Sequence, residues 1–406
     1  MPLEKKHLLF SIFIIISAIL SLPLLGDYGF LFPLGRDLIF KLLTEILLIF
    51  YLLLISKDKT YFPKINALSL SVFSFWLING LATIFSRQPE FSFWGNPFRG
   101  QGFFSLTHYF IFFLILTSVI KIRLTWKKFL YLITLISFPI MLVAQSEIIS
   151  LVPRAQSTLN NPNFLAAYIL LVFFINLILL FKEKNSKLKI FFIVNLTWQI
   201  IALYFTRCRG AYIALVAGIL LFCLLYIFLK NRRWFFISLG ILMFLAVAAL
   251  IFFVLWYAKI QRLPVAEMPE RFLSINQRLE SYKTALSGTR SRPLLGYGPE
   301  NFVIAFDKYY SGSLEATNYR WFDKVHNIFL ETSVTSGILG LLAYLAILFF
   351  AFQNLAKKLN LLSLALAATL FAYIIQNQFN IDSVSSLIYF YFLIGLSDFS
   401  KNHEII

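Results

Sequence analysis

The sequence predicts an all-α protein that crosses a membrane many times, and three observations support this fold class. Hydrophobic residues make up 59% of the 406 residues and charged residues only 14%, whereas soluble chains average roughly 45–50% and about 25%. The apolar residues form long runs instead of one stripe per helix. The only cysteines, Cys208 and Cys223, lie in or beside these runs, which argues against a disulfide scaffold. A soluble enzyme is therefore excluded.

Twelve apolar segments have about the length that crosses a bilayer, whose ~30 Å core needs about 20 helical residues. The predicted spans are residues 8–25, 38–56, 66–86, 103–120, 129–146, 163–181, 189–206, 210–229, 234–256, 327–353, 360–378 and 383–399. The first resembles a signal peptide, with Lys5 and Lys6 before its apolar core. Eleven further spans favour an uncleaved helix instead. A short polar stretch from Gln376 to Asp382 separates the last two spans.

The distribution of the +17 net charge predicts the orientation. With the N-terminus placed inside, the inside segments hold about three times as many Lys and Arg residues as the short outside loops, as the positive-inside rule requires. The outside loops hold only arginines, namely Arg36, Arg87, Arg99, Arg154, Arg207 and Arg209. We therefore predict a multi-pass membrane protein with both termini cytoplasmic.

A large external loop, residues 257–325, divides the chain into three parts. Residues 1–256 hold nine spans, and residues 326–406 hold three spans and a cytoplasmic tail. The loop is rich in arginine, including Arg271, Arg278, Arg290 and Arg292. Topology does not explain this charge, because long loops cross the membrane largely regardless of it. We expect an anionic partner there, such as a phosphate-bearing lipid or sugar donor, and no nucleic acid.

Within the loop, Pro269 and Gly288 are predicted to delimit a helix that lies on the membrane or on the bundle. Its apolar residues recur at steps of three and four, at Phe272, Ile275, Leu279, Tyr282 and Leu286. Arg271 and Arg278 share one face of this helix, where they bind an anion or extend to lipid headgroups. A turn-rich segment with Gly296 and Gly298 follows, and it lacks the third glycine of a dinucleotide-binding motif.

Two further features at the outer face are candidates for chemistry. His326 stands at the outer mouth of the tenth span, and Asp323 is expected on the same side of that helix. A histidine oriented by a carboxylate suits a general base, although a hydrogen-bonded interfacial histidine is the alternative. Arg209 lies in a very short external turn with Arg207, where an arginine near membrane depth usually has an anionic partner.

Taken together, these motifs resemble the superfamily of O-antigen ligases, O-antigen polymerases and bacterial protein O-oligosaccharyltransferases. The resemblance covers nearly the whole chain. It rests on Gly95-Asn-Pro-Phe-Arg99-Gly-Gln-Gly102, Leu159-Asn-Asn-Pro-Asn163-Phe, Arg207-Cys-Arg209-Gly-Ala, Arg278 with Tyr282, Pro293-Leu-Leu-Gly-Tyr-Gly-Pro-Glu-Asn-Phe302, and His326-Asn327 followed by Gly337-Ile-Leu-Gly340. The sequence departs from the family pattern at Thr335-Ser336, where an acidic residue often precedes the glycine.

The resemblance implies a membrane glycosyltransferase whose donor is a glycan on a polyprenyl, usually undecaprenyl, pyrophosphate. The acceptor would be a hydroxyl of lipid A core, of another glycan or of a protein, and membrane lipids surround the site. Arg209 and Arg278 match the pyrophosphate-binding arginines and His326 the proposed base, while Arg207, Arg290, Arg292 and Arg99 remain further candidates for the pyrophosphate. The implied reaction is inverting, without metal or other cofactor. The external carboxylates also favour a reaction without metal, because they form no Asp-x-Asp pair that could hold one.

Two other functions compete with the ligase. A polymerase would use the same donor to extend a lipid-linked glycan, and the sequence separates it poorly from a ligase. A transporter or lipid flippase would need polar groups near the middle of the bilayer and often internal repeats. The spans carry few charges and show no repeat, so transport is the weaker alternative.

Overall fold

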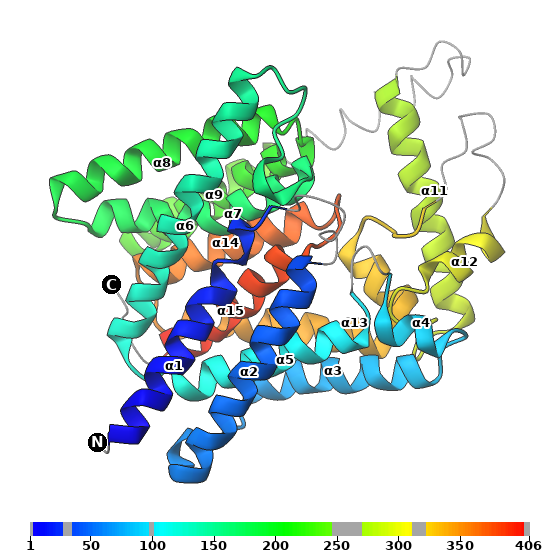
Figure 1. Cartoon of the computed structure of the whole chain (residues 1–406). Coiled ribbons are helices and arrows are strands. Elements are labelled where there is room, and N and C mark those ends of the chain that lie inside the picture. The colour runs from blue at the N-terminus through cyan, green and yellow to red at the C-terminus, as the bar shows by residue number, and fades with distance from the viewer. Residues whose placement is uncertain (1–2, 27–34, 97–100, 246–269, 311–321, 402–406) are drawn as a thin grey trace.

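A computed structural model describes residues 3–26, 35–96, 101–245, 270–310 and 322–401, with the side chains of 270–275 excepted. Every regular element in these residues is a helix (Figure 1). Eight helices are long and apolar enough to cross a membrane, and three apolar helices are slightly shorter. The protein is an all-α polytopic membrane protein, as predicted.

The helices follow the predicted spans closely. In the N-terminal part they are α1 (Leu3–Leu20), α2 (Gly35–Lys57), α3 (Ala67–Ile84), α4 (Pro89–Trp94), α5 (Phe103–Val119), α6 (Arg123–Ile149), α7 (Pro162–Lys182), α8 (Ser186–Phe205) and α9 (Arg209–Lys230). After these come α11 (Glu270–Ser291), α12 (Phe302–Tyr309), α13 (Ile328–Lys357), α14 (Leu361–Gln376) and α15 (Val384–Ser400). Of the ninth predicted span (234–256), residues 234–245 lie in a helix that begins at residue 232, and the remainder lies outside the described residues.

The core of the bundle is built on α7, α14 and α15. Residues 165–176 of α7 are all buried, as expected for a helix that is apolar on every side. Around this centre α9 packs on α14, α3 on α13, α5 on α15 and α1 on α2. The two chain ends lie on one side of the bundle, whereas α4, α11 and α12 lie at the opposite end (Figure 1).

The long helix α13 is broken at Gly337, and the turn-rich segment before α12 fills the break. Gly337 has a φ of 69°, so its backbone cannot continue the α-helical ladder. The amides of Tyr297 and Gly298 donate to Val334 O (2.9 Å) and Thr335 O (2.8 Å), while Ile338 N donates to Pro293 O (2.7 Å). The loop and the kinked helix are therefore one structural unit.

Two local predictions about the outer face are wrong. Helix α11 does not end at Gly288 but continues to Ser291, because this glycine serves helix packing. A side chain there would meet Val334 at 2.8 Å and Ala305 at 2.9 Å. Residues 322–327 are not helical, so His326 and Asp323 do not share a helix side. Helix α13 begins only after these residues, and Asn327 caps it. The Asn327 Oδ1 accepts hydrogen bonds from the Phe329 and Leu330 amides at 3.1 Å.

Candidate active site

A cavity of about 160 Å³ opens at the end of the bundle that carries α4, α11 and α12. Its walls come from α3, α5, α13, α14 and α15 and from the loops before α12, α13 and α15. The polar and charged side chains in its lining are Asn79, Gln101, Glu300, Lys324, His326, Asn327, Glu331, Thr332, Thr335, Ser336, Asn380 and Asp382, together with the tyrosines Tyr109, Tyr344, Tyr373 and Tyr391. The apolar bundle thus encloses a polar chamber at one end.

His326 is the histidine that lines this cavity. Its φ is 59°, a conformation that a non-glycine residue rarely adopts and that surrounding structure must hold in place. The ring of Phe322 stands edge-on to the imidazole, with centroids 5.9 Å apart. Asp323 is half-buried and is not part of the lining. The sharp turn therefore directs the histidine and not its acidic neighbour into the chamber.

A buried cluster of three charges holds the segment that carries His326. Lys324 pairs with Glu300, and its Nζ lies 3.3 Å from Glu331 Oε1. The second oxygen of Glu331 accepts from the Val325 amide at 2.7 Å. All three charged side chains are at most 16% exposed. The residues immediately before His326 are therefore fixed to both α13 and the loop before α12.

The stretch from Gln376 to Asp382, here called the polar turn, forms the wall facing α13. Asp382 accepts hydrogen bonds from Tyr373 Oη (2.8 Å), Asn377 Nδ2 (3.1 Å) and Ser386 Oγ (2.9 Å). Burial raises the pKa of Asp382, and these hydrogen bonds oppose that rise. The main chain of the turn accepts from Ile328 N at 2.9 Å and from Gln101 Nε2 at 2.6 Å.

The elements that carry Arg209 and Arg278 both reach this polar turn. Arg209 begins α9, and a side chain at the next residue, Gly210, would meet Phe379 Cβ at 3.0 Å. One turn after Arg278, Tyr282 donates to Gln378 O at 3.1 Å. Burial raises the pKa of Tyr282, and the nearby Arg278 charge opposes the rise. Neither arginine lines the described cavity, although the helix of each contacts the polar turn.

The other candidate arginines are placed differently. Arg207 is exposed beside α9 with a φ of 55°, and Arg290 is exposed near the end of α11. The Arg292 guanidinium lies over the Tyr297 ring at 5.4 Å and donates to Phe85 O at 3.4 Å, contacts that bind the kink-filling loop to α3. Arg99 lies outside the described residues.

Sequence reasoning missed most of the acidic and amide side chains of the site. From the sequence, Glu300 is only one of the scattered external carboxylates, Glu331 has no assigned role, and the polar turn is only a separator of two spans. One available signal was the presence of charge in apolar surroundings, because a buried ionisable group usually has a dedicated partner. The partner of Glu300, Lys324, lies 24 residues away, so the sequence could not identify it.

Comparison with known protein families gives a match that spans much of this region. Residues 194–345 match the model of a protein family described as O-antigen ligase. The matched segment includes Arg209, Arg278, the charge cluster and His326. No curated protein matches the chain. Through residues 194–345, the chain is similar to O-antigen ligases, which supports a membrane glycosyltransferase of the O-antigen ligase or polymerase type.

Proposed function

We propose that this protein is a ligase that transfers a glycan from a polyprenyl (undecaprenyl) pyrophosphate to an acceptor hydroxyl at the outer face of the inner membrane. The acceptor is lipid A core, another glycan or a protein. The observation that carries the proposal is the convergence on the polar turn of three elements, which bear Arg209, Arg278 and His326. Two cations and a potential base are thus carried by elements that meet beside one chamber.

The two arginines suit the leaving group of this reaction. Negative charge develops on the pyrophosphate as the glycosidic bond breaks, and fixed cations stabilise it. Arginine keeps its charge and presents a planar fork to phosphate oxygens. Arg209 also stands in the first turn of α9, where the helix dipole favours an anion.

An apolar groove beside the chamber suits the polyprenyl tail. It lies between α3 and α13 and is lined by Ala67, Leu70, Ser71, Ser74, Ile78, Leu339, Leu342, Ala343, Ala346 and Phe350. At 1.5 Å per residue, the stretch from Ala67 to Ile78 runs roughly 16 Å along α3. The hydrogen bond from Ser336 to Asn79, at 2.6 Å, joins the two helices where both residues line the cavity. A lipid headgroup in the chamber could therefore leave its tail in the groove.

His326 is proposed to accept the proton of the attacking hydroxyl. The reaction then inverts the anomeric carbon: the acceptor oxygen forms a bond to it from the face opposite the pyrophosphate, the bond to the pyrophosphate breaks, and the hydroxyl proton passes to the imidazole. General-base assistance of this kind contributes roughly 10²–10⁴-fold. Asp323, outside the cavity lining, is assigned at most a role in polarising or positioning the ring.

The test uses purified protein with polyprenyl-linked glycan and candidate acceptors, and it measures donor binding and transfer separately. Arg209→Lys and Arg278→Ala should weaken donor binding, because one loses the bidentate fork and the other the charge. His326→Ala should abolish transfer and leave donor binding nearly intact. Lys308→Ala, which removes an exposed cation of the same external region that is not a candidate for the pyrophosphate, is the control and should change neither donor binding nor transfer. Loss of donor binding in His326→Ala would make the residue a phosphate or structural contact and remove the base assignment.

The product distinguishes the ligase from the polymerase, which is the second candidate. A polymerase yields lengthened glycans that remain on the polyprenyl carrier, whereas a ligase moves the glycan to a different acceptor. We also predict that EDTA leaves the transfer rate unchanged, because the arginines stabilise the developing charge on the pyrophosphate that a metal would otherwise stabilise. A rate restored only by added Mg²⁺ or Mn²⁺ would contradict this part of the proposal.

A further inference from the structure

A second pocket lies at the opposite end of the bundle, on the side of the chain ends. It encloses about 350 Å³ between the start of α3, the end of α5, the start of α6 and the end of α15. Its lining includes Phe62, Lys64, Ile65, Lys121, Asp398 and Lys401. We call it the lysine pocket, and it shares no residue with the candidate active site.

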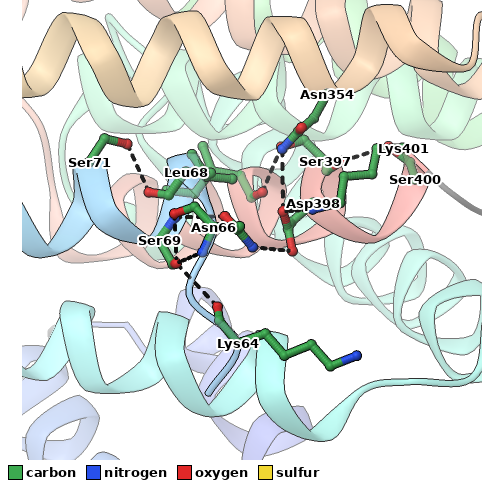
Figure 2. Close-up of polar contacts among 11 residues, drawn as sticks. Lys64, Asn66, Leu68, Ser69, Ser71, Asn354, Ser397, Asp398, Ser400 and Lys401 are labelled. Atoms are coloured by element: carbon green, nitrogen blue, oxygen red, sulfur yellow. Dashed lines mark hydrogen bonds and ion pairs between the residues drawn. The ribbon is translucent and has the colours of Figure 1, made fainter.

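The charge of the lysine pocket is positive. It contains three lysines and one carboxylate. Lys401 Nζ lies 2.7 Å from Asp398 Oδ1, and the amides of Asn66 and Asn354 donate to the same carboxylate at 3.2 and 3.3 Å (Figure 2). Asp398 is thus neutralised by partners within the protein. Two further lysines, Lys64 and Lys121, remain as excess positive charge.

These two lysines line the same pocket, where their like charges oppose each other. Burial lowers the pKa of Lys121, and the charge of Lys64 lowers it further. Lys121 Nζ donates to Thr60 O and lies 4.2 Å from the Tyr61 ring centroid. Figure 2 shows the Lys64 ammonium extended away from the Asp398 cluster. An anion placed between the two ammonium groups would relieve this repulsion.

The remaining walls are apolar and partly exposed. Ile65 is 88% exposed and Phe62 52%, so large apolar side chains stand beside the lysines at the pocket mouth. Trp126 and Phe113, both buried, form its floor. Adjacent cationic and apolar groups are typical of the level where a bilayer meets water. Lysines beside apolar side chains fit an amphiphile better than a free soluble anion, because a soluble anion would make no favourable contact with the apolar rim.

We propose that the lysine pocket binds the phosphate headgroup of an anionic phospholipid from the leaflet on the side of the chain ends. Lys64 and Lys121 contact the phosphate, and the acyl chains pack against Phe62 and Ile65. Because Lys64 precedes α3 and Lys121 lies between α5 and α6, the bound lipid holds the start of α3 against the α5–α6 junction. Occupancy therefore stabilises the fold without taking part in glycan transfer.

The test compares lipids in nanodiscs that contain the full chain. Phosphatidylglycerol should raise the thermal unfolding midpoint relative to phosphatidylcholine, and native mass spectrometry should retain one phosphatidylglycerol. Each lysine near the surface contributes about fivefold in affinity, so Lys64→Gln with Lys121→Gln should weaken phosphatidylglycerol binding roughly 30-fold. The control is Lys182→Gln with Lys187→Gln, two exposed lysines at the junction of α7 and α8, which should bind as the unmodified protein does.

Inorganic phosphate separates the two possible sources of the anion. At ~10 mM it should give no stabilisation, and equal stabilisation by phosphate alone would overturn the assignment to a lipid. The proposal also fails if the Lys64/Lys121 variant and the Lys182/Lys187 variant lose phosphatidylglycerol binding equally. All readouts are of binding and stability, so they remain informative whether or not the protein proves to be a ligase.

Discussion

Replacement of Lys324 by methionine tests the charge cluster that fixes the candidate base. The substitution keeps an unbranched chain of similar length and removes only the charge. Lys324 Nζ lies 3.3 Å from Glu331 Oε1 and also pairs with Glu300. At an effective dielectric constant of 20, the 3.3 Å pair alone is worth about 5 kcal/mol before desolvation is counted. Removing one partner of a buried pair typically costs about 3–5 kcal/mol, because the remaining charge is left buried.

The matched control is Lys283→Met, the same substitution in an exposed ion pair. Lys283 Nζ lies 2.7 Å from Glu280 Oε1, closer than Lys324 lies to Glu331, but the lysine side chain is 72% exposed. Solvent screens such pairs, so its loss should cost about 0–1 kcal/mol. The assay is equilibrium unfolding in detergent micelles, followed by far-ultraviolet circular dichroism. Adding Glu300→Gln to Lys324→Met should recover part of the stability, since one buried negative charge is removed.

Transfer should respond as well, because Glu331 also accepts the amide of Val325 next to His326. A misplacement of about 1 Å at a catalytic group can cost ~10²-fold. We expect Lys324→Met to lower kcat at least tenfold and to change donor binding much less. Our account of the cluster is refuted if Lys324→Met destabilises the protein no more than Lys283→Met does.

Three further predictions follow from the same structure. Gly337→Ala should lower the free energy of unfolding by more than about 3 kcal/mol, because the new methyl would lie 2.0 Å from Leu294 O. The left-handed backbone contributes ~1–2 kcal/mol of this loss, and each lost hydrogen bond contributes ~1 kcal/mol. Gly240→Ala, with nothing within 4 Å, should be neutral or stabilising in the same unfolding assay. Ala346→Phe should obstruct the groove and raise KM for a full-length polyprenyl donor but not for a short-chain analogue. An equal rise in KM for both donors would show that the groove does not bind the polyprenyl tail. Membrane-impermeant maleimide applied to intact cells should label Asp307→Cys and not Ser186→Cys, both exposed positions, and the reverse pattern would invert the predicted topology.

The sequence by itself determined the fold class and the positions of the spans. Both follow from local composition, because a run of about 20 apolar residues has few structures other than a membrane-crossing helix. The helix after Pro269 was also predictable from its periodicity, although its end at Ser291 was not. Motif resemblance then selected Arg209, Arg278 and His326, three residues whose elements meet at the polar turn.

Only the tertiary structure decided how these residues are held. The break in α13 at Gly337 is filled by Pro293 to Gly298, and the loop is fixed further where Ser86 Oγ donates to Tyr297 O at 2.8 Å, across 211 positions. His326 was expected on a helix, yet its turn depends on partners at Glu300 and Glu331. Periodicity and propensity report on neighbours within one or two turns. The site is made by pairs that are distant in sequence and buried together, because an apolar bundle tolerates charge only where another segment supplies the partner.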